Sequence, residues 1–390
     1  MLNYIDSVDV NGENSKMKII IAPDSFKGAL SSPLVCEALK KGWLERRPQD
    51  EVLLFPLADG GEGTCEALVR SGQGVFFDCA AHDPLMRAVT CRCGITGKGN
   101  TGVMELAAAS GIELLSRAEL APLKTTTFGS GEVMKYLLDR GCRHFLLGIG
   151  GSATVDGGAG MLQALGAVFY DERGERLPDG IGGGDLKRIA RVDWSGLDER
   201  IFASRIDVAC DVTNPLLGPQ GAAVVFGPQK GASPEDVERL EENLEHWAEL
   251  CGGDCRLPGS GAAGGVGFML RTVLKGELSS GAELVIKCSG LDDALENASL
   301  LITGEGCSDD QTLCGKLPAV AAAHGAQRGV PAVLCSGALK GDCSALEKVF
   351  SGVFSISPGA VTLDEAIAAT ALNLRLTGAN LAALATVYQK

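Results

Sequence analysis

Two strand–loop–helix units follow one another near the start of the chain, and this pattern constrains the fold more than any other feature. Residues 18–22 form a short apolar run typical of a buried strand, and apolar residues then recur at helical spacing from Leu34 to Trp43. The second unit has a strand at 51–55 and a helix at 65–72. Successive units of this kind predict parallel strands in one sheet covered by helices.

The C-terminal third returns to the same pattern, with strands expected at 298–303 and 331–337. The middle of the chain differs, because glycine-rich loops separate its strands. We therefore expect an α/β protein of two domains, with a cleft between them as the ligand site. The expected parts are a flexible leader at 1–16, a discontinuous domain at 17–77 plus 285–390, and an inserted α/β domain at 78–284.

Two local signals mark helix starts. Ser32 precedes Pro33 and is expected to cap the first helix. Thr362 and Glu365 have the spacing of a capping box.

Composition excludes several classes of partner. The 390 residues carry a net charge of −14, which argues against a general binder of nucleic acid or of anionic membranes. Only Cys91 and Cys93 lie close together among the 14 cysteines, so buried thiols are a better interpretation than a metal site. Free thiols, with no apolar run of membrane-spanning length and no signal sequence, predict a cytoplasmic protein.

The stretch "GIGGSATVDGGAG", residues 148–160, lies between an apolar strand and a helix. Backbone N–H groups and a helix N-terminus attract anions at such a turn. A purely structural tight turn is the alternative, and the stretch is neither a Walker A loop nor a dinucleotide fingerprint. The candidate ligand residues here are Gly150, Gly151, Ser152, Thr154, Asp156 and Gly157.

A second loop of this kind, "PGSGAAGGVGF" at 258–268, precedes another apolar helix. Two backbone cradles suit an extended polyanion such as a nucleotide triphosphate, and close packing is the alternative. Its candidates are Gly261, Gly264 and Gly265.

Acidic residues follow several expected strands. The carboxyl ends of parallel strands gather at one edge of a sheet, where carboxylates repel one another unless a cation joins them. Mg²⁺ prefers one or two carboxylates together with phosphate oxygens and water. Each residue alone is more often a turn or cap residue. The candidates are Asp24, Asp59, Glu62, Asp211, Glu305, Asp309 and Asp310.

Three lysines, Lys27, Lys230 and Lys316, stand in glycine-containing loops. Each can meet a phosphate or a substrate carboxylate, although a solvated lysine is the alternative for each one. Glycine cradles, carboxylates with Mg²⁺ and lysines together fit phosphoryl transfer, in which positioning and charge neutralisation dominate. These residues do not identify the acceptor.

Eight motifs, taken in order, resemble the type-1 glycerate kinase family from Lys18 onward. They are "IAPDSFKGALS", "PLADGGEGT", "ELAAASGIEL", "GIGGSATVDGGAGMLQALGA", "CDVTNPLLGPQGA", "VFGPQKGA", "PGSGAAGGVG" and "ITGEGCSDDQTLCGK". The resemblance implies ATP- and Mg²⁺-dependent phosphorylation of D-glycerate to 2-phosphoglycerate. It also implies a Rossmann-like domain made from both chain ends and an inserted α/β domain.

The match extends to individual residues. Ser25 lies in the first motif, and Asp309, Gln311, Thr312 and Lys316 match the last. Three positions depart from the common pattern: Val155 replaces Asn, Cys307 stands where the family commonly has Arg, and Cys314 where it often has His.

We expect Lys27 and Lys316, on loops of one domain, to hold the glycerate carboxylate. Asp24 or Asp309 is expected to orient the attacking hydroxyl. Asp211 and Asp309 are the preferred Mg²⁺ ligands, with Asp59, Glu62 and Glu305 as alternatives.

Two other functions stay open: a kinase of this fold for another small hydroxy acid, and a catalytically weak regulator that binds nucleotide or sugar acid. Neither nucleic acid nor a membrane is expected as partner, and a homo-oligomer is compatible with the sequence.

Overall fold

The computed structural model describes residues 16–57, 64–97 and 100–388. The contacts within it divide the chain into two compact units. The first comprises the residues up to Pro56, Asp293–Leu313 and the residues from Ala321 onward; the second comprises Leu57–Asp292 and Cys314–Val320. The sequence assigned Leu57 and residues 64–77, 285–292 and 314–320 to the domain built from both chain ends, but their contacts are in the second unit. All but one residue of the expected leader lies outside the described residues.

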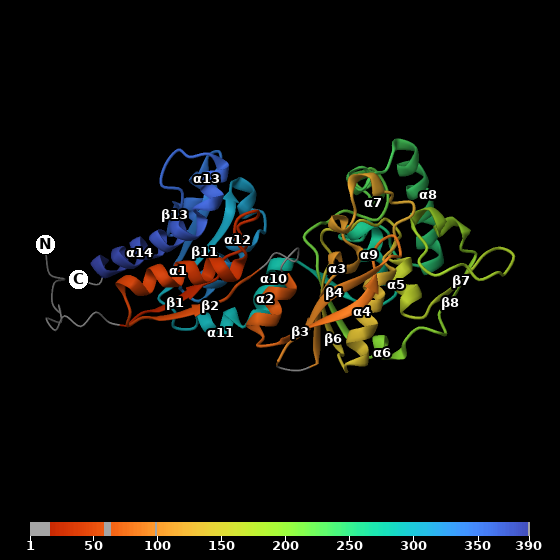
Figure 1. Cartoon of the computed structure of the whole chain (residues 1–390), viewed down its shortest axis with the longest axis horizontal. Coiled ribbons are helices and arrows are strands. Elements are labelled where there is room, and N and C mark those ends of the chain that lie inside the picture. Colours follow the sequence, from red (N-terminus) through yellow and green to blue (C-terminus); the bar gives the residue numbers. More distant parts are fainter. Residues whose placement is uncertain (1–15, 58–63, 98–99, 389–390) are drawn as a thin grey trace, which may run out of the picture. The chain divides into compact units, whose positions relative to one another are not determined.

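The first unit is built on a five-stranded parallel sheet in the order β13-β12-β11-β1-β2 (Figure 1). The chain adds β2 on one side of β1 and the later strands on the other, so the strand order reverses between β1 and β11. Ligands of open parallel sheets bind at such a reversal, beyond the carboxyl ends of the strands. The strands are β1 (Lys18–Ile21), β2 (Glu51–Leu54), β11 (Leu300–Ser308), β12 (Ala332–Leu339) and β13 (Gly352–Ser355).

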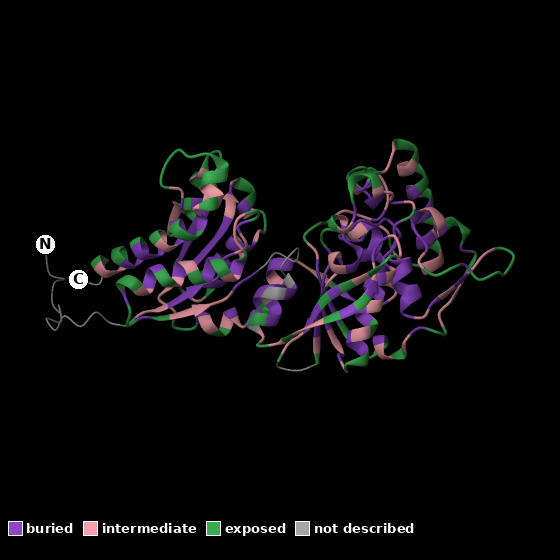
Figure 2. Ribbon diagram, in the orientation of Figure 1, coloured by how far each residue is buried: buried purple, intermediate pink, exposed green. Residues whose placement is uncertain are grey.

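Helices α1 and α14 lie side by side next to this sheet (Figure 1). Leu39 and Trp43 of α1 share a buried core with Ile19 and Ile21 of β1, and Figure 2 shows the buried residues running along β1, β11 and β12. The helices near these strands are α1 (Ser32–Arg46), α11 (Leu291–Leu295), η5 (Asp310–Leu313), α12 (Leu317–Gln327), η6 (Cys343–Lys348), α13 (Leu363–Ala368) and α14 (Thr370–Tyr388).

The second unit contains a six-stranded mixed sheet in the order β10-β9-β6-β5-β4-β3. The strands from β10 to β5 are parallel, and β4 and β3 continue the sheet in antiparallel fashion. They are β3 (Val75–His82), β4 (Ala88–Ile95), β5 (Thr101–Glu105), β6 (His144–Gly148), β9 (Arg205–Ala209) and β10 (Glu277–Ser279), and a separate hairpin joins β7 (Val168–Tyr170) to β8 (Arg191–Asp193).

Helices and glycine-rich loops enclose the core of this unit, which includes Phe145, Phe169, Trp247 and Phe268. No helix in the described part of the chain is both long and apolar enough to cross a membrane. The helices are α2 (Thr64–Ser71), α3 (Ala107–Ser110), η1 (Ile112–Leu114), η2 (Arg117–Glu119), α4 (Phe128–Asp139), α5 (Ala159–Ala164), η3 (Gly183–Arg188), α6 (Glu199–Phe202), α7 (Ala222–Phe226), η4 (Pro228–Lys230), α8 (Pro234–Cys251), α9 (Ala262–Thr272) and α10 (Gly281–Ser289).

The two helix-start predictions had different outcomes. The capping box is confirmed, because the N–H of Thr362 donates to Glu365 Oε2 at 2.9 Å and the N–H of Glu365 donates to the Thr362 hydroxyl at 3.4 Å. The Ser32 cap is wrong: α1 begins at Ser32 with Ser31 as its N-cap residue. The Ser32 hydroxyl instead donates to the carbonyl oxygen of Pro23 at 2.7 Å, tying the helix start to the loop after β1.

The contact between α1 and α14 depends on two glycines. A Cβ atom added to Gly42 would lie 1.8 Å from the carbonyl oxygen of Arg375, and one added to Gly378 would lie 2.4 Å from that of Leu39. The two backbones therefore approach more closely than side chains allow.

We expect Gly42→Ala to lower the free energy of unfolding by about 1–3 kcal/mol, because the added methyl group forces the helices apart. Urea unfolding measures the loss. Gly359→Ala is the matched control, since a Cβ there would meet nothing within 4 Å. Equal stability of both variants would contradict the close approach.

Candidate active site

The loop that leaves β1 is tied to β11 at the strand reversal. The N–H of Asp24 donates to the carbonyl oxygen of Gly304 at 2.8 Å, and the buried Thr303 hydroxyl donates to that of Ala22 at 2.8 Å. Asp24 and Ser25 are half-buried here, and Lys27 is exposed. The carboxylate and the lysine predicted on this loop thus reach the edge where ligands of parallel sheets bind.

Glycines let the backbones meet at this edge. A Cβ on Gly304 would lie 2.2 Å from the carbonyl oxygen of Cys335, and one on Gly337 would lie 2.4 Å from that of Gly306. A Cβ on Gly306 would lie 3.4 Å from the backbone nitrogen of Lys27. The loop carrying Lys27 therefore lies directly against β11.

A hydrogen-bond network orders the segment after β11. Buried Glu305 accepts from the Ser308 hydroxyl at 2.8 Å and from the Thr312 hydroxyl at 2.6 Å. The Thr312 oxygen in turn accepts from the N–H of Asp309 at 3.1 Å, and Asp309 Oδ1 accepts from the N–H of Gln311 at 3.0 Å. The Thr312 hydroxyl therefore links the Glu305 carboxylate to the backbone of Asp309.

Lys316 follows this segment, but its contacts place it in the second unit. The expectation that Lys27 and Lys316 belong to one domain is therefore wrong on contacts. Lys316 lies just before α12, and its carbonyl oxygen accepts from the N–H groups of Ala319 and Val320 at 3.1 Å each.

In the second unit the turn after β6 is exposed at only two residues of its glycine-rich stretch. Gly150 and Gly151 are exposed, whereas residues 152–160 are buried. Gly151 has a φ of +69°, which favours glycine. Its carbonyl oxygen accepts from the N–H of Ile112 at 2.9 Å, and the N–H of Ala153 donates to Ser110 at 2.9 Å. The exposed part of this turn is thus held against the segment after α3.

Asp156 is fully buried, with its carboxylate satisfied inside the chain. It accepts from the N–H and the hydroxyl of Thr127, both at 2.8 Å, and from the N–H groups of Gly158 at 3.1 Å and Gly160 at 3.3 Å. Burial raises its pKa, against the Thr127 hydrogen bonds that lower it. These contacts give Asp156 a structural role in place of the predicted ligand role. The role of Thr127 was not predicted, because the only sign of it in the sequence is a run of threonines before a helix.

The two glycine-rich loops pack on each other rather than forming two separate cradles. The N–H of Gly157 donates to the carbonyl oxygen of Gly264 at 3.0 Å. A Cβ on Gly264 would lie 2.0 Å from the carbonyl oxygen of Thr154, and one on Gly265 would lie 2.9 Å from Gly157 Cα. Gly261 packs in the same way on Pro215, at 2.2 Å. Close packing therefore accounts for the glycines predicted to bind phosphate in the second loop.

Lys230 lies beneath the first loop and is 2% exposed. Its Nζ donates to Ser152 Oγ and to the carbonyl oxygen of Thr154, both at 2.7 Å. Burial lowers the pKa of this amine to about 7, and the charge of Asp156 opposes the shift. The Thr154 hydroxyl has no hydrogen-bond partner within the described residues.

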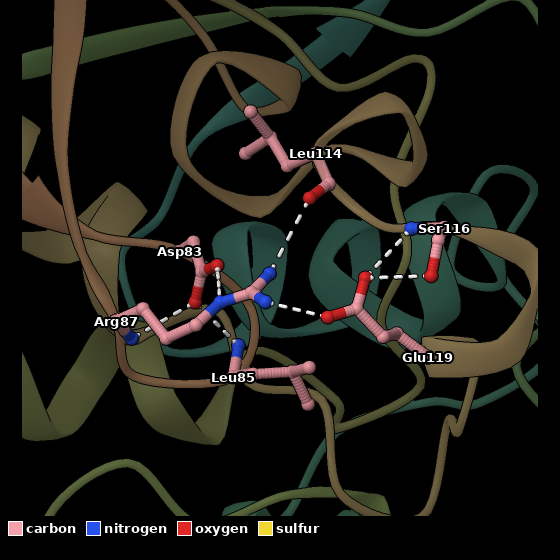
Figure 3. Close-up of polar contacts among 6 residues, drawn as sticks. All are labelled: Asp83, Leu85, Arg87, Leu114, Ser116 and Glu119. Atoms are coloured by element: carbon pink, nitrogen blue, oxygen red, sulfur yellow. Dashed lines mark hydrogen bonds and ion pairs between the residues drawn. The ribbon is translucent and has the colours of Figure 1, made fainter.

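Arg87 ties the segment beside Gly151 to the β3–β4 turn (Figure 3). It donates to Asp83 Oδ2 and to Glu119 Oε1 at 2.5 Å each, and to the carbonyl oxygen of Leu114 at 3.4 Å. The N–H and hydroxyl of Ser116 donate to Glu119 at 2.8 Å, and together with Arg87 they lower its pKa to about 2. No local pattern in the sequence indicates this network, because Arg87 and Glu119 are 32 residues apart in the chain.

Asp211 follows β9 and is exposed, and its Oδ1 accepts from the N–H of Gly281 at 2.9 Å. Asp59 and Glu62 lie outside the described residues. Within residues 16–57, 64–97 and 100–388, no three His, Cys, Asp or Glu side chains are grouped so as to hold a metal ion. The Cys91–Cys93 prediction is confirmed: both are buried free thiols.

The five-stranded parallel sheet, with polar residues at the carboxyl ends of its strands, is typical of an α/β enzyme. The family model described as the glycerate kinase family matches residues 19–386. The chain therefore belongs to the glycerate kinase family, which confirms the resemblance read from its motifs.

Individual relatives agree with this family. A glycerate kinase of Bacillus subtilis (strain 168) and a glycerate 2-kinase of Escherichia coli (strain K12) are each 42% identical over 94% of this chain and 97% of their own. A crystal structure assigned as glycerate kinase 2 from Salmonella typhimurium LT2 superposes with a TM-score of 0.88 at 42% identity. The match covers 96% of this chain and all of that one.

The contacts of Asp156 lead to a stability prediction. We expect Asp156→Ala to lower the free energy of unfolding by on the order of 3 kcal/mol, because it leaves buried N–H donors unsatisfied. Urea unfolding measures the loss. Asp179→Ala is the control, because it removes only an exposed ion pair to Arg176 and should cost less than about 1 kcal/mol. A loss for Asp156→Ala no larger than that of the control would argue against the structural role.

Proposed function

We propose that this chain transfers a phosphoryl group from ATP to D-glycerate and releases 2-phosphoglycerate. The observation that carries the proposal is the contact of the Asp24–Lys27 loop with β11 at the strand reversal. This edge brings one cation and several carboxylates into the place where parallel sheets bind ligands. The names of the relatives, glycerate kinase and glycerate 2-kinase, support the acceptor.

The acceptor end of the reaction belongs to this edge. Glycerate offers one carboxylate and two hydroxyls, and exposed Lys27 supplies a cation for the carboxylate. Asp24 or Asp309 orients the attacking hydroxyl. A loose transition state requires little help from a base, so orientation is the larger contribution of that carboxylate.

The phosphate end belongs to the exposed turn of the second unit. Backbone N–H groups of Gly150, Gly151 and Ser152 supply neutral donors there, and a strand-to-helix turn with exposed glycines suits an anion. Lys316 is a further candidate cation for the phosphates. Gly157, Gly261, Gly264 and Gly265 shape this region through packing.

Mg²⁺ requires one or two carboxylates besides phosphate oxygens and water, so a cluster of three acidic residues is not needed. Asp309 or Asp211 would hold it, with Glu305 as an alternative. Mg²⁺ supplies charge neutralisation on the transferring phosphate.

A coupled assay of ADP release tests the proposal. It compares D-glycerate, L-glycerate and other small hydroxy acids, with and without Mg²⁺, and phosphorus NMR identifies the product. Turnover with D-glycerate that gives 2-phosphoglycerate supports the proposal. Preference for another acid favours the second kinase function, and binding without turnover favours the regulator. The cytoplasmic location stays a prediction.

Lys27→Ala should reduce kcat/KM roughly thirty- to a thousand-fold, because losing a carboxylate clamp costs about 2–4 kcal/mol. The KM for glycerate should rise more than that for ATP. Steady-state kinetics measure both. Lys41→Ala, which removes an exposed lysine of α1, is the control and should change neither value. If only the ATP value changes, Lys27 belongs to the phosphates.

We also expect Asp309→Asn and Asp211→Asn to lower turnover and to raise the Mg²⁺ concentration that gives half-maximal rate, because each loses a charge proposed to face the metal ion. A titration of Mg²⁺ at saturating substrates measures this. Normal Mg²⁺ dependence in both variants would remove these residues from the metal site.

A further inference from the structure

Lys230 is a long basic side chain placed where water does not reach. It ends η4, and the next residue, Gly231, has a φ of +94°. A Cβ on Gly231 would lie 2.5 Å from the carbonyl oxygen of Leu120, so this turn is pressed against the segment that follows η2. The backbone of Lys230 is therefore fixed, and its side chain extends under the loop after β6.

The amine of Lys230 supports the exposed turn from below. Its two hydrogen bonds go to Ser152 Oγ and to the carbonyl oxygen of Thr154, which both lie shortly after Gly151 in the chain. From the other side, Ser110 and Ile112 pair with Ala153 and Gly151. The exposed turn thus has two supports, of which only Lys230 can change its charge.

The hydrogen-bond count fits an uncharged amine. A neutral amine has two N–H donors, and both observed acceptors take one each. The third N–H of an ammonium has no acceptor among the described residues. Burial, which lowers the pKa of Lys230 to about 7, favours the neutral form at slightly alkaline pH.

Few charges act on this amine. The carboxylate of Asp156 is the charge that favours the ammonium, and it already accepts hydrogen bonds from Thr127 and two glycine N–H groups. On the neighbouring segment Glu119 is bound to Arg87, and Lys124 is exposed. A new negative charge near Ser152 would therefore be felt strongly, because the amine is buried and little screened by water.

We propose that Lys230 is a positioning residue for the Gly150–Ser152 turn, and that an anion bound on this turn draws a proton from solvent onto its amine. The inference rests on the anion site of the proposed function and adds to it a buried group that responds to occupancy. The ligand is an anionic oxygen group, either the phosphates of a nucleotide or the carboxylate of glycerate. The proton comes from solvent or buffer, and the nitrogen lone pair accepts it.

The sign of the pH dependence follows from this uptake. Where binding takes up a proton, the association constant falls as the pH rises from about 7, by up to tenfold per pH unit. Glycerate has no group that titrates in this range. The nucleotide phosphates are ionised at about pH 8 and contribute little there.

Isothermal titration calorimetry at about pH 8, in two buffers of different ionisation enthalpy, measures the protons taken up. The probes are ATP with Mg²⁺ and D-glycerate, each titrated into the full chain. We expect on the order of half a proton or more for the probe that occupies the turn. Lys230→Met should abolish this uptake and raise the Kd of the same probe, while the other probe changes little.

Gln229→Met is the matched control, because Gln229 is the exposed neighbour of Lys230 in the same turn. It should keep both the affinity and the proton uptake. If the wild-type protein binds both probes without taking up protons, the inference is wrong. This test needs no variant, so it holds even if the Lys230→Met protein does not fold. Proton uptake that persists in a folded Lys230→Met protein overturns it equally.

Gly151→Val separates this inference from the proposed function. Valine is strained at a φ of +69° and should weaken the probe that binds on the turn. If Gly151→Val leaves the binding of both probes unchanged, the anion site itself is wrong. If it weakens one probe whose binding takes up no proton, the anion site stands and the role of Lys230 is wrong.

Discussion

The buried carboxylate of Asp156 is the contact on which the loops of the second unit depend. It draws the residues just before α4 and the first turn of α5 onto one pair of oxygens, with Thr127 on one side and Gly158 and Gly160 on the other. A buried charge is tolerated only when hydrogen bonds satisfy it. The bonds to Thr127, Gly158 and Gly160 supply that satisfaction, and they also fix where the glycine-rich loop can run. The exposed turn at Gly150 and Gly151 is the part of this loop that remains for a ligand.

The sequence predicted that the glycine-rich loops bind an anion, with close packing as the alternative. In the second loop the structure shows close packing. Gly264 has no room for a side chain because the carbonyl oxygen of Thr154 lies too close. At Gly157 the indole of Trp247 fills the space, since its Cδ1 would lie 2.4 Å from an added Cβ. A bound ligand and a closely packed backbone both require glycine at such a position. The sequence alone therefore does not distinguish a ligand site from close packing. Exposure, which the sequence does not contain, is what sets Gly150 and Gly151 apart.

Local patterns predicted the local structure well. Apolar runs located β1, β2, β11 and β12, and the capping box at Thr362 formed as expected, because these features depend on neighbours in the chain. The errors concern longer range. Ser32 was predicted to cap a helix, but its hydroxyl donates to the carbonyl oxygen of Pro23. Lys316 was predicted to lie in the same domain as Lys27, but its contacts are in the second unit. The neighbouring residues in the sequence do not indicate which distant segment a loop residue will contact.

Two positions that depart from the family pattern, Val155 and Cys307, lie in different surroundings. Val155, where the family commonly has Asn, is fully buried in the core of the second unit, so its substitution changes packing. Cys307, where an Arg is common, is half-buried on β11 and pairs with Ala338 of β12. The neighbouring Ser308 hydroxyl still orders Glu305, and the backbone of Lys27 lies against Gly306. With no Arg at position 307, the positive charge at this edge would come from Lys27, which makes that lysine the sharper test of the proposed acceptor site.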